Sequence, residues 1–88
     1  MSSAPTQLTM YSTSWCPFCV RLKAGLKAEG ISFVEVDIDE NPDAIPFVES
    51  VNGGNRTVPT LHYPSGATQT NPSVAQVKQA LAGTGVVD

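Results

Sequence analysis

The chain has 88 residues, of which 41% are hydrophobic and 15% charged, and its formal net charge is −3. This length predicts one domain, residues 1–88, with a modest core, and the composition excludes a disordered chain. The acidic balance and the scattered basic residues argue against nucleic-acid binding, and no apolar stretch is long enough to span a membrane. We expect a cytoplasmic monomer without a secretion signal, with loose termini at residues 1–6 and 84–88.

The first half of the chain alternates strand, helix and strand. Apolar patterning predicts strands over residues 8–12 and 32–37, with a helix over residues 17–29 between them. Gly30 is expected to end this helix. Two strands joined by a helix over so short a stretch predict a parallel βαβ unit. The helix side chains expected to face the core recur at a spacing of four residues: Phe18, Leu22 and Leu26.

The second half predicts a helix, two strands and a last helix. The helix near residues 43–51 contains Pro46, which is tolerated only in a first turn and predicts an irregular start. Strands over residues 60–63 and 67–70 flank a tight-turn signal and are expected to pair antiparallel. Asn71, followed by a proline, is the expected cap of the last helix. The resulting order is β-α-β-α-β-β-α.

Two cysteines, Cys16 and Cys19, stand where the first helix is expected to begin. A disulfide between residues this close constrains little chain, so the pair indicates redox chemistry rather than architecture. Free amide N–H groups and the positive end of the helix dipole favour a thiolate at a helix N-terminus. We therefore expect Cys16 to attack a disulfide, and the more buried, less ionised Cys19 to resolve the mixed disulfide. Two cysteines and one histidine fall short of the usual four ligands, so we predict no metal site.

A second motif, Thr57-Val58-Pro59, precedes the third strand. The bond before a proline adopts the cis form at modest cost, although trans is much more frequent, and the motif by itself favours trans. A cis Pro59 beside Cys16 would turn the Val58 backbone outward as an edge that a substrate backbone can pair with.

The segment Trp15-Cys16-Pro17-Phe18-Cys19 after a strand, followed by Thr57-Val58-Pro59, resembles the glutaredoxin family of the thioredoxin superfamily. The resemblance covers nearly the whole chain. It implies a thioredoxin-like α/β fold, in which a four-stranded mixed sheet has helices on both faces. It also implies thiol–disulfide exchange without a bound cofactor, and a cis Pro59 that faces Cys16 as part of the docking edge.

The region before the last helix departs from the glutathione-using members of this family. Those members carry a Gly-Gly pair and then an acidic pair that helps hold the α-amino end of glutathione. The matching positions here are Gln69-Thr70 and Asn71-Pro72-Ser73, which include no carboxylate. Residues 50–60, together with residues 13–16 and 70–73, are similar to the mycoredoxins, actinobacterial glutaredoxin-like proteins that work with mycothiol, a thiol without a free α-amino group.

The resemblance therefore implies mycothiol as co-substrate and S-mycothiolated or disulfide-containing proteins as partners. A flavoprotein disulfide reductase is a further potential source of electrons. The residues expected to contact substrate around the two cysteines are Trp15, Pro17, Phe18, Arg56, Thr57, Val58, Pro59, Thr70, Asn71 and Ser73.

Two alternatives share parts of this pattern. Glutaredoxin-like electron donors to ribonucleotide reductase, which thioredoxin reductase feeds, carry the same two motifs. They typically have a Trp-Ser-Gly-Phe-Arg-Pro run before the last helix, whereas residues 68–72 here contain no aromatic residue and no arginine. Iron–sulfur carriers of the family usually have small residues after the first cysteine, where this chain has Pro17.

Overall fold

The computed structural model describes residues 7–83, so the termini expected to be loose, 1–6 and 84–88, lie outside the described residues. The predicted order of elements is confirmed, with a short 3-10 helix, η1, added before the second helix. Among residues 7–83, no helix has the length and apolar character that crossing a membrane requires. The elements are β1 (Thr9–Ser12), α1 (Pro17–Ala28), β2 (Val34–Asp37), η1 (Pro42–Ala44), α2 (Ile45–Ser50), β3 (Thr60–His62), β4 (Thr68–Thr70) and α3 (Val74–Gly83).

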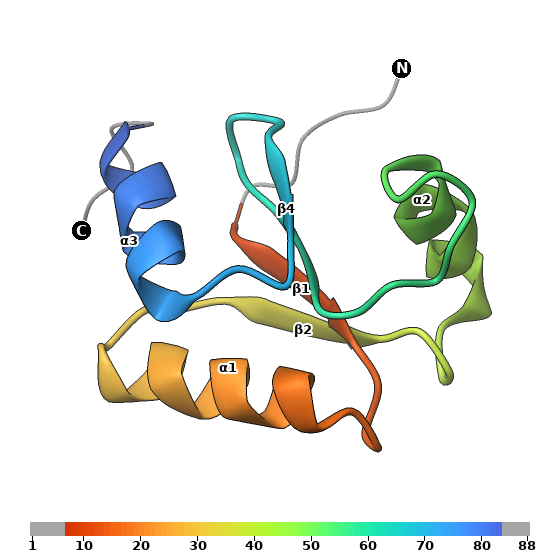
Figure 1. Ribbon diagram of the computed structural model, residues 1–88, viewed down its shortest axis with the longest axis horizontal. Coiled ribbons are helices and arrows are strands. Elements are labelled where there is room, and N and C mark those ends of the chain that lie inside the picture. The colour runs from red at the N-terminus through yellow and green to blue at the C-terminus, as the bar shows by residue number, and fades with distance from the viewer. Residues whose placement is uncertain (1–6, 84–88) are drawn as a thin grey trace.

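The four strands form one mixed sheet in the order β2-β1-β3-β4 (Figure 1). β1 pairs parallel with β2, as the βαβ prediction requires, whereas β3 pairs antiparallel with both β1 and β4. Each strand is one or two residues shorter than the pattern predicted. The irregular start expected around Pro46 is the step from η1 into α2, and Pro46 lies in the first turn of α2.

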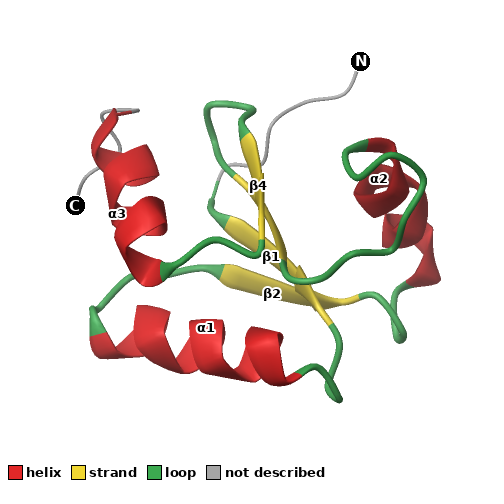
Figure 2. Cartoon of the chain, viewed as in Figure 1, coloured by secondary structure: helices red, strands yellow, loops and turns green. Residues whose placement is uncertain are grey.

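Helices cover both faces of the sheet, as predicted (Figure 2). Met10 and Leu61 lie opposite each other on neighbouring strands and belong to the buried cluster beneath α1 and α3. Their neighbours Tyr11 and His62 point to the other face, where the Phe47 ring of α2 lies 5.3 Å from Tyr11 and 4.6 Å from His62. The alternation along β1 and β3 therefore gives the sheet two apolar faces.

The prediction that Phe18 faces the core is wrong. Its side chain is 54% exposed, whereas Leu22 and Leu26 are buried as expected. The buried stripe of α1 begins at Cys19, three residues before Leu22, and Phe18 in the first turn lies outside the packed core.

The last helix begins later than predicted, and its cap is Ser73 rather than Asn71. The Ser73 hydroxyl accepts a hydrogen bond from the Gln76 N–H at 3.1 Å, and the Gln76 side chain accepts one from the Ser73 N–H at 2.8 Å. This reciprocal pair is a capping box, for which Ser-x-x-Gln is a sequence signature. Asn71 has a left-handed backbone, with φ of 50°, and its N–H donates to the Pro59 carbonyl instead.

Helices α1 and α3 pack closely against each other at Gly25. A Cβ at this position would lie 2.6 Å from Cγ2 of Val74, the first residue of α3. Because the Val74 side chain is β-branched and stiff, it has little room to move away. Gly25 is therefore needed for close helix packing.

We predict that Gly25→Ala lowers the free energy of unfolding by about 1 kcal/mol. Alanine gains about 1 kcal/mol of helix propensity, but overpacking costs roughly 1–3 kcal/mol. In a Val74→Ala background the same change should become stabilising, because the clash is gone. Urea denaturation of the four proteins of this cycle measures both effects, and equal effects in the two backgrounds would contradict the assignment.

Candidate active site

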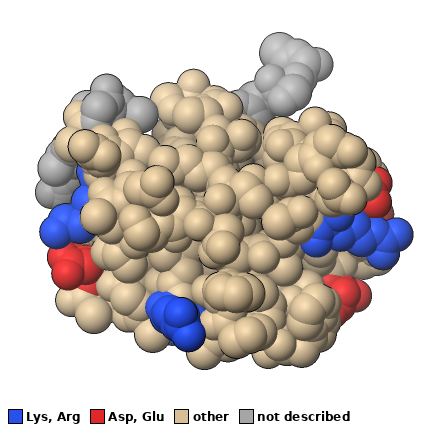
Figure 3. All heavy atoms as spheres, viewed as in Figure 1, with Lys and Arg blue, Asp and Glu red and all other residues tan. Residues whose placement is uncertain are grey.

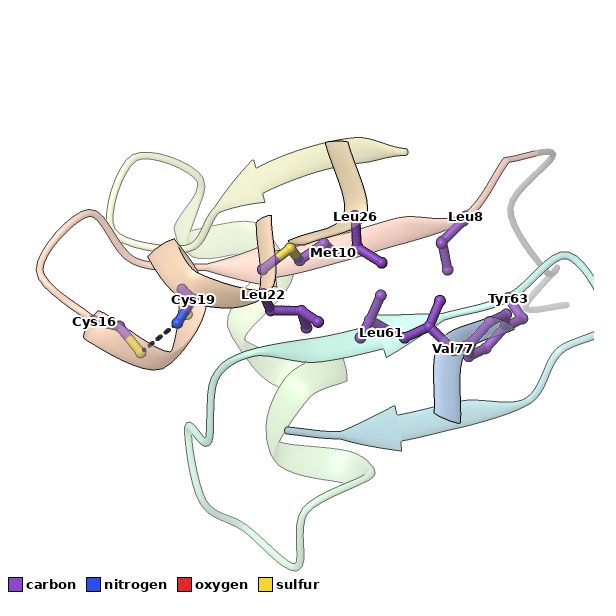
Figure 4. Packing of buried hydrophobic residues seen from close by; sticks show 9 residues of the cluster. All are labelled: Leu8, Met10, Cys16, Cys19, Leu22, Leu26, Leu61, Tyr63 and Val77. Carbon is purple, nitrogen blue, oxygen red and sulfur yellow. Dashed lines mark hydrogen bonds between the residues drawn. The ribbon is translucent and has the colours of Figure 1, made fainter. Parts of the chain in front are cut away.

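Cys16 occupies the N-cap position of α1, and Pro17 follows at the first helical position. The Cys16 backbone is extended, with φ of −88° and ψ of 113°, which lets its side chain turn back over the first turn. The Cys19 N–H donates a hydrogen bond to the Cys16 sulfur at 3.3 Å (Figure 4). The sulfur thus takes the place that a serine or aspartate oxygen occupies in an ordinary cap, where the free N–H groups favour negative charge.

Cys19 lies one turn further along the helix, inside the hydrophobic core. It is 1% exposed and packs in the cluster that also holds Leu22 and Leu26. Burial, and secondarily its hydrogen bond with Cys16, raises the pKa of the Cys19 thiol to about 12. The expectation that Cys19 is the more buried of the pair is confirmed for the reduced protein, since Cys19 is 1% exposed and Cys16 4%.

The Thr57-Val58-Pro59 motif, which we call the docking segment after its expected role, lies beside the first cysteine. The Val58–Pro59 peptide bond is cis, as the family resemblance implied and contrary to what the frequency of trans bonds favoured. The Cys16 thiol points at the Val58 carbonyl, with 3.9 Å between sulfur and oxygen. Val58 itself is partly buried against the same core cluster. The two motifs, far apart in the sequence, therefore meet at one place.

The site opens to solvent through the neighbours of Cys16. Cys16 is only 4% exposed, but it lies at the outer end of the buried cluster (Figure 4), and Pro17 beside it is exposed. Trp15 and Phe18 are 71% and 54% exposed and present large apolar surfaces next to the sulfur. The Trp15 indole N–H donates to the Asp39 carboxylate at 2.9 Å, so a turn after β2 orients this ring.

Several residues expected to contact substrate already have partners within the chain. The Arg56 guanidinium forms an ion pair with Glu49 at 3.2 Å. The Ser73 hydroxyl and N–H are both used in the capping box of α3. The Thr70 hydroxyl donates to the Asn52 side chain, and the Thr57 carbonyl accepts from the Thr60 hydroxyl. Asn71, another residue expected to contact substrate, donates a backbone hydrogen bond to the Pro59 carbonyl.

A charged network behind the site fixes α1 against the sheet. Glu35 on β2 accepts hydrogen bonds from Lys23 of α1, at 2.9 and 3.2 Å, and from the buried Ser12 hydroxyl, at 2.8 Å. Burial raises the pKa of Glu35, but the hydrogen bonds from Lys23 and Ser12 outweigh it, and the net shift is downward. Ser12 is the last residue of β1, and the loop that leads to Cys16 follows it directly. The network therefore restrains the start of that loop.

The rest of the visible surface is sparsely charged. In Figure 3 the lysine, arginine and acidic side chains lie near the margins of the face, and uncharged atoms fill its middle. Within residues 7–83, no three histidine, cysteine or acidic side chains gather into a group that could hold a metal ion.

A sequence model of the glutaredoxin family matches residues 8–63, a segment that includes both cysteines and the cis proline. This chain belongs to the glutaredoxin family. It is 57% identical over 74 residues to a protein of Mycobacterium tuberculosis named as a glutaredoxin, covering 84% of this chain and 88% of that one. It is 43% identical over 72 residues to mycoredoxin 1 of Corynebacterium glutamicum, covering 82% and 89%.

Solved structures agree with this assignment. The glutaredoxin of Archaeoglobus fulgidus superimposes with a TM-score of 0.67 at 28% identity, covering 83% of each chain. A wheat glutaredoxin superimposes with a TM-score of 0.68 over 96% of this chain and 80% of that one; at 22% identity it supports the fold alone. The protein is accordingly a glutaredoxin-like thiol–disulfide oxidoreductase with a thioredoxin-like fold.

The sequence did not reveal three residues that organise the site. Gln76 could have been found from the Ser-x-x-Gln capping signature. Asp39 and Asn52 act through side-chain hydrogen bonds to residues far away in the sequence, at Trp15 and Thr70. No local pattern identifies such partners, since aspartate and asparagine are ordinary residues in turns.

We predict that the reduced native protein takes up one equivalent of iodoacetamide between pH 7 and 9, and that the label is on Cys16. The Cys19 thiol stays protonated over this range because its pKa is about 12. Intact-mass and fragment-ion mass spectrometry locate the label, and the urea-unfolded protein, which should take up two equivalents, is the control. Equal labelling of both cysteines in the native protein would overturn the distinction between them.

Proposed function

We propose that this protein reduces mixed disulfides between proteins and mycothiol, with Cys16 as the nucleophile and Cys19 as the resolving cysteine. The observation that carries the proposal is the sulfur of Cys16 at the N-cap of α1, with the Cys19 N–H directed at it. A group in this position is favoured as an anion, and the thiolate is the form of cysteine that attacks disulfides.

The first step is an exchange at the mycothiol sulfur. The Cys16 thiolate forms a bond to that sulfur while the bond to the protein sulfur breaks, and the client leaves as a thiolate that takes up a proton. Val58, whose carbonyl faces Cys16, is the docking edge for the client or thiol backbone. Trp15 and Phe18, which lie close to Cys16 in the sequence, supply exposed apolar surface.

The second step releases the small thiol from Cys16. A second mycothiol can attack the Cys16–mycothiol bond, which yields mycothiol disulfide and restores the Cys16 thiolate. Alternatively, the Cys19 sulfur attacks the Cys16 sulfur, and the bond between Cys16 and mycothiol breaks, so that mycothiol leaves as a thiol. The resulting Cys16–Cys19 disulfide is then reduced by a reductant such as a flavoprotein reductase. The burial that raises the Cys19 pKa leaves little thiolate at neutral pH and favours the first route.

The choice of mycothiol rests on the uncharged residues 69–73 and on the likeness to mycoredoxin 1. Residues 69–73, where glutathione-using members place acids, contain no carboxylate that could pair with an α-amino group. Mycothiol has no such group, so these residues suit it. Because the cycle needs Cys16 as a reduced thiol, we place the protein in the reducing cytoplasm.

We predict that Cys16→Ser lowers reduction of an S-mycothiolated protein to the uncatalysed background, whereas Cys19→Ser keeps roughly half of the wild-type rate or more. The first change removes the attacking sulfur, and the second removes only the slow internal route. Release of the client thiol, followed by mass spectrometry, measures both. Full activity of Cys16→Ser would exclude it as the nucleophile.

We also predict that the protein prefers mycothiol to glutathione. With one client protein carrying either mycothiol or glutathione, and the same thiol as reductant, kcat/KM should be roughly tenfold or more higher for mycothiol. Equal values would remove the case for mycothiol. Rapid reduction of the protein by thioredoxin reductase and NADPH, together with equal values, would favour the electron-donor alternative.

A further inference from the structure

Asn52, in the turn after α2, makes side-chain hydrogen bonds to three separate elements. Its Nδ2 donates to the Val48 carbonyl in α2 at 2.8 Å and to the Thr60 hydroxyl in β3 at 3.0 Å. Its Oδ1 accepts a hydrogen bond from the Thr70 hydroxyl at the end of β4. Both amide protons and the amide oxygen are therefore used, and each bond leads to a different part of the fold.

The bonds of Asn52 continue into the docking segment. The Thr60 hydroxyl, which is fully buried, donates to the Thr57 carbonyl at 2.7 Å and so closes the turn that contains Val58 and Pro59. On the other side, the residue after Thr70 donates its backbone N–H to the Pro59 carbonyl at 2.7 Å. Thr60 and Thr70 also lie directly opposite each other in the sheet.

These contacts form a closed ring. It runs from Asn52 to Thr60, along the chain to Pro59, across to Asn71, back to Thr70 and so to Asn52 again. The ring includes Pro59, the C-terminal residue of the docking segment. The carbonyl of the preceding residue, Val58, faces the Cys16 sulfur at 3.9 Å. Asn52 itself does not contact either cysteine through any of these bonds.

We propose that Asn52 is a positioning residue that holds the Val58–Pro59 docking segment at a fixed distance from Cys16. The proposal rests on the proposed function, because the segment matters only if a substrate pairs with it. Positioning of this kind supports catalysis, since small displacements of a bound reacting group lower rates steeply. Removing Asn52 should therefore weaken substrate docking while leaving the Cys16 sulfur and its helix unchanged.

The side-chain amide of Asn52 can make these hydrogen bonds in only one orientation. A substitution that removes its donors but keeps its size therefore tests them directly. The Val48 carbonyl only accepts hydrogen bonds, and the single proton of Thr60 is already directed to Thr57. Two donors must therefore lie on one side of residue 52 and an acceptor on the other. Asn52→Asp keeps the size but replaces both donors with an oxygen that repels the Val48 carbonyl.

The experiment compares Asn52→Asp and Asn52→Ala with wild type and with Ser50→Ala. Ser50 is the matched control, because it also donates to a carbonyl of α2, that of Phe47, but has no bond to the docking segment. For an S-mycothiolated client, both Asn52 variants should lower kcat/KM roughly 10- to 100-fold, mainly through a higher KM. Ser50→Ala should stay within about twofold of wild type, as is usual for exposed positions. The rate of Cys16 alkylation should not change in any of them.

A second readout does not depend on the substrate. Hydrogen exchange of the Asn71 amide reports the bond to Pro59, and it should be roughly tenfold faster in both Asn52 variants than in Ser50→Ala. If wild type fails to reduce the client, the proposed function fails, and this exchange still decides whether Asn52 holds the segment. Unchanged exchange, or a KM equal to that of Ser50→Ala, overturns the proposal.

Thr70→Val removes the hydrogen bond from Thr70 to Asn52 and so breaks the same ring at an exposed position. It replaces the Asn52 variants in the experiment if those do not fold. It should raise KM in the same direction. Combined with Asn52→Ala, its effect on KM should be less than additive, because both changes break one ring. Fully additive effects would show that the two residues act independently and would contradict the proposal.

Discussion

The contact on which the site depends is that between the amide end of α1 and the Cys16 sulfur. Pro17 can start a helix but donates no backbone hydrogen bond, so the first available N–H groups belong to residues further along, including Cys19. That N–H points at the sulfur at 3.3 Å. The helix start therefore fixes the orientation of the sulfur, and the sulfur in turn caps the helix. Chemistry and local stability share one interaction.

Two identical side chains lie in different surroundings because one turn of helix separates them. Cys16 lies outside the first turn, at the rim of the core, whereas Cys19 falls on the same stripe as Leu22 and Leu26. The burial that makes Cys19 a useful core residue also raises its thiol pKa to about 12. In the proposed mechanism packing thus separates the roles, since the residue that stabilises the helix against the sheet is the one whose thiol resists ionisation.

Local patterns predicted the order of the elements, the parallel and antiparallel pairings and the place of the cysteines, because periodicity and turn residues act over a few positions. They failed where one position could satisfy two patterns. Phe18 fits a stripe with Leu22 as well as Cys19 does, and only packing decides between them. Asn71 precedes a proline and resembles a cap, but its N–H bonds to Pro59, across the sheet. Contacts between distant segments, such as those of Asn52, leave no periodic trace in the sequence.

Recognition of the small thiol must use the groups that the fold leaves uncommitted. Ser73 is occupied in its capping box, so binding through its hydroxyl or N–H would first break an internal contact and gain little. The exposed faces of Trp15 and Phe18 carry no such cost. Exposed apolar rings near Cys16 in the sequence, with no carboxylate in residues 69–73, suit a ligand that is bulky and uncharged near its sulfur. The mycothiol selectivity that we propose would therefore come from shape and stacking around Cys16 rather than from ion pairing.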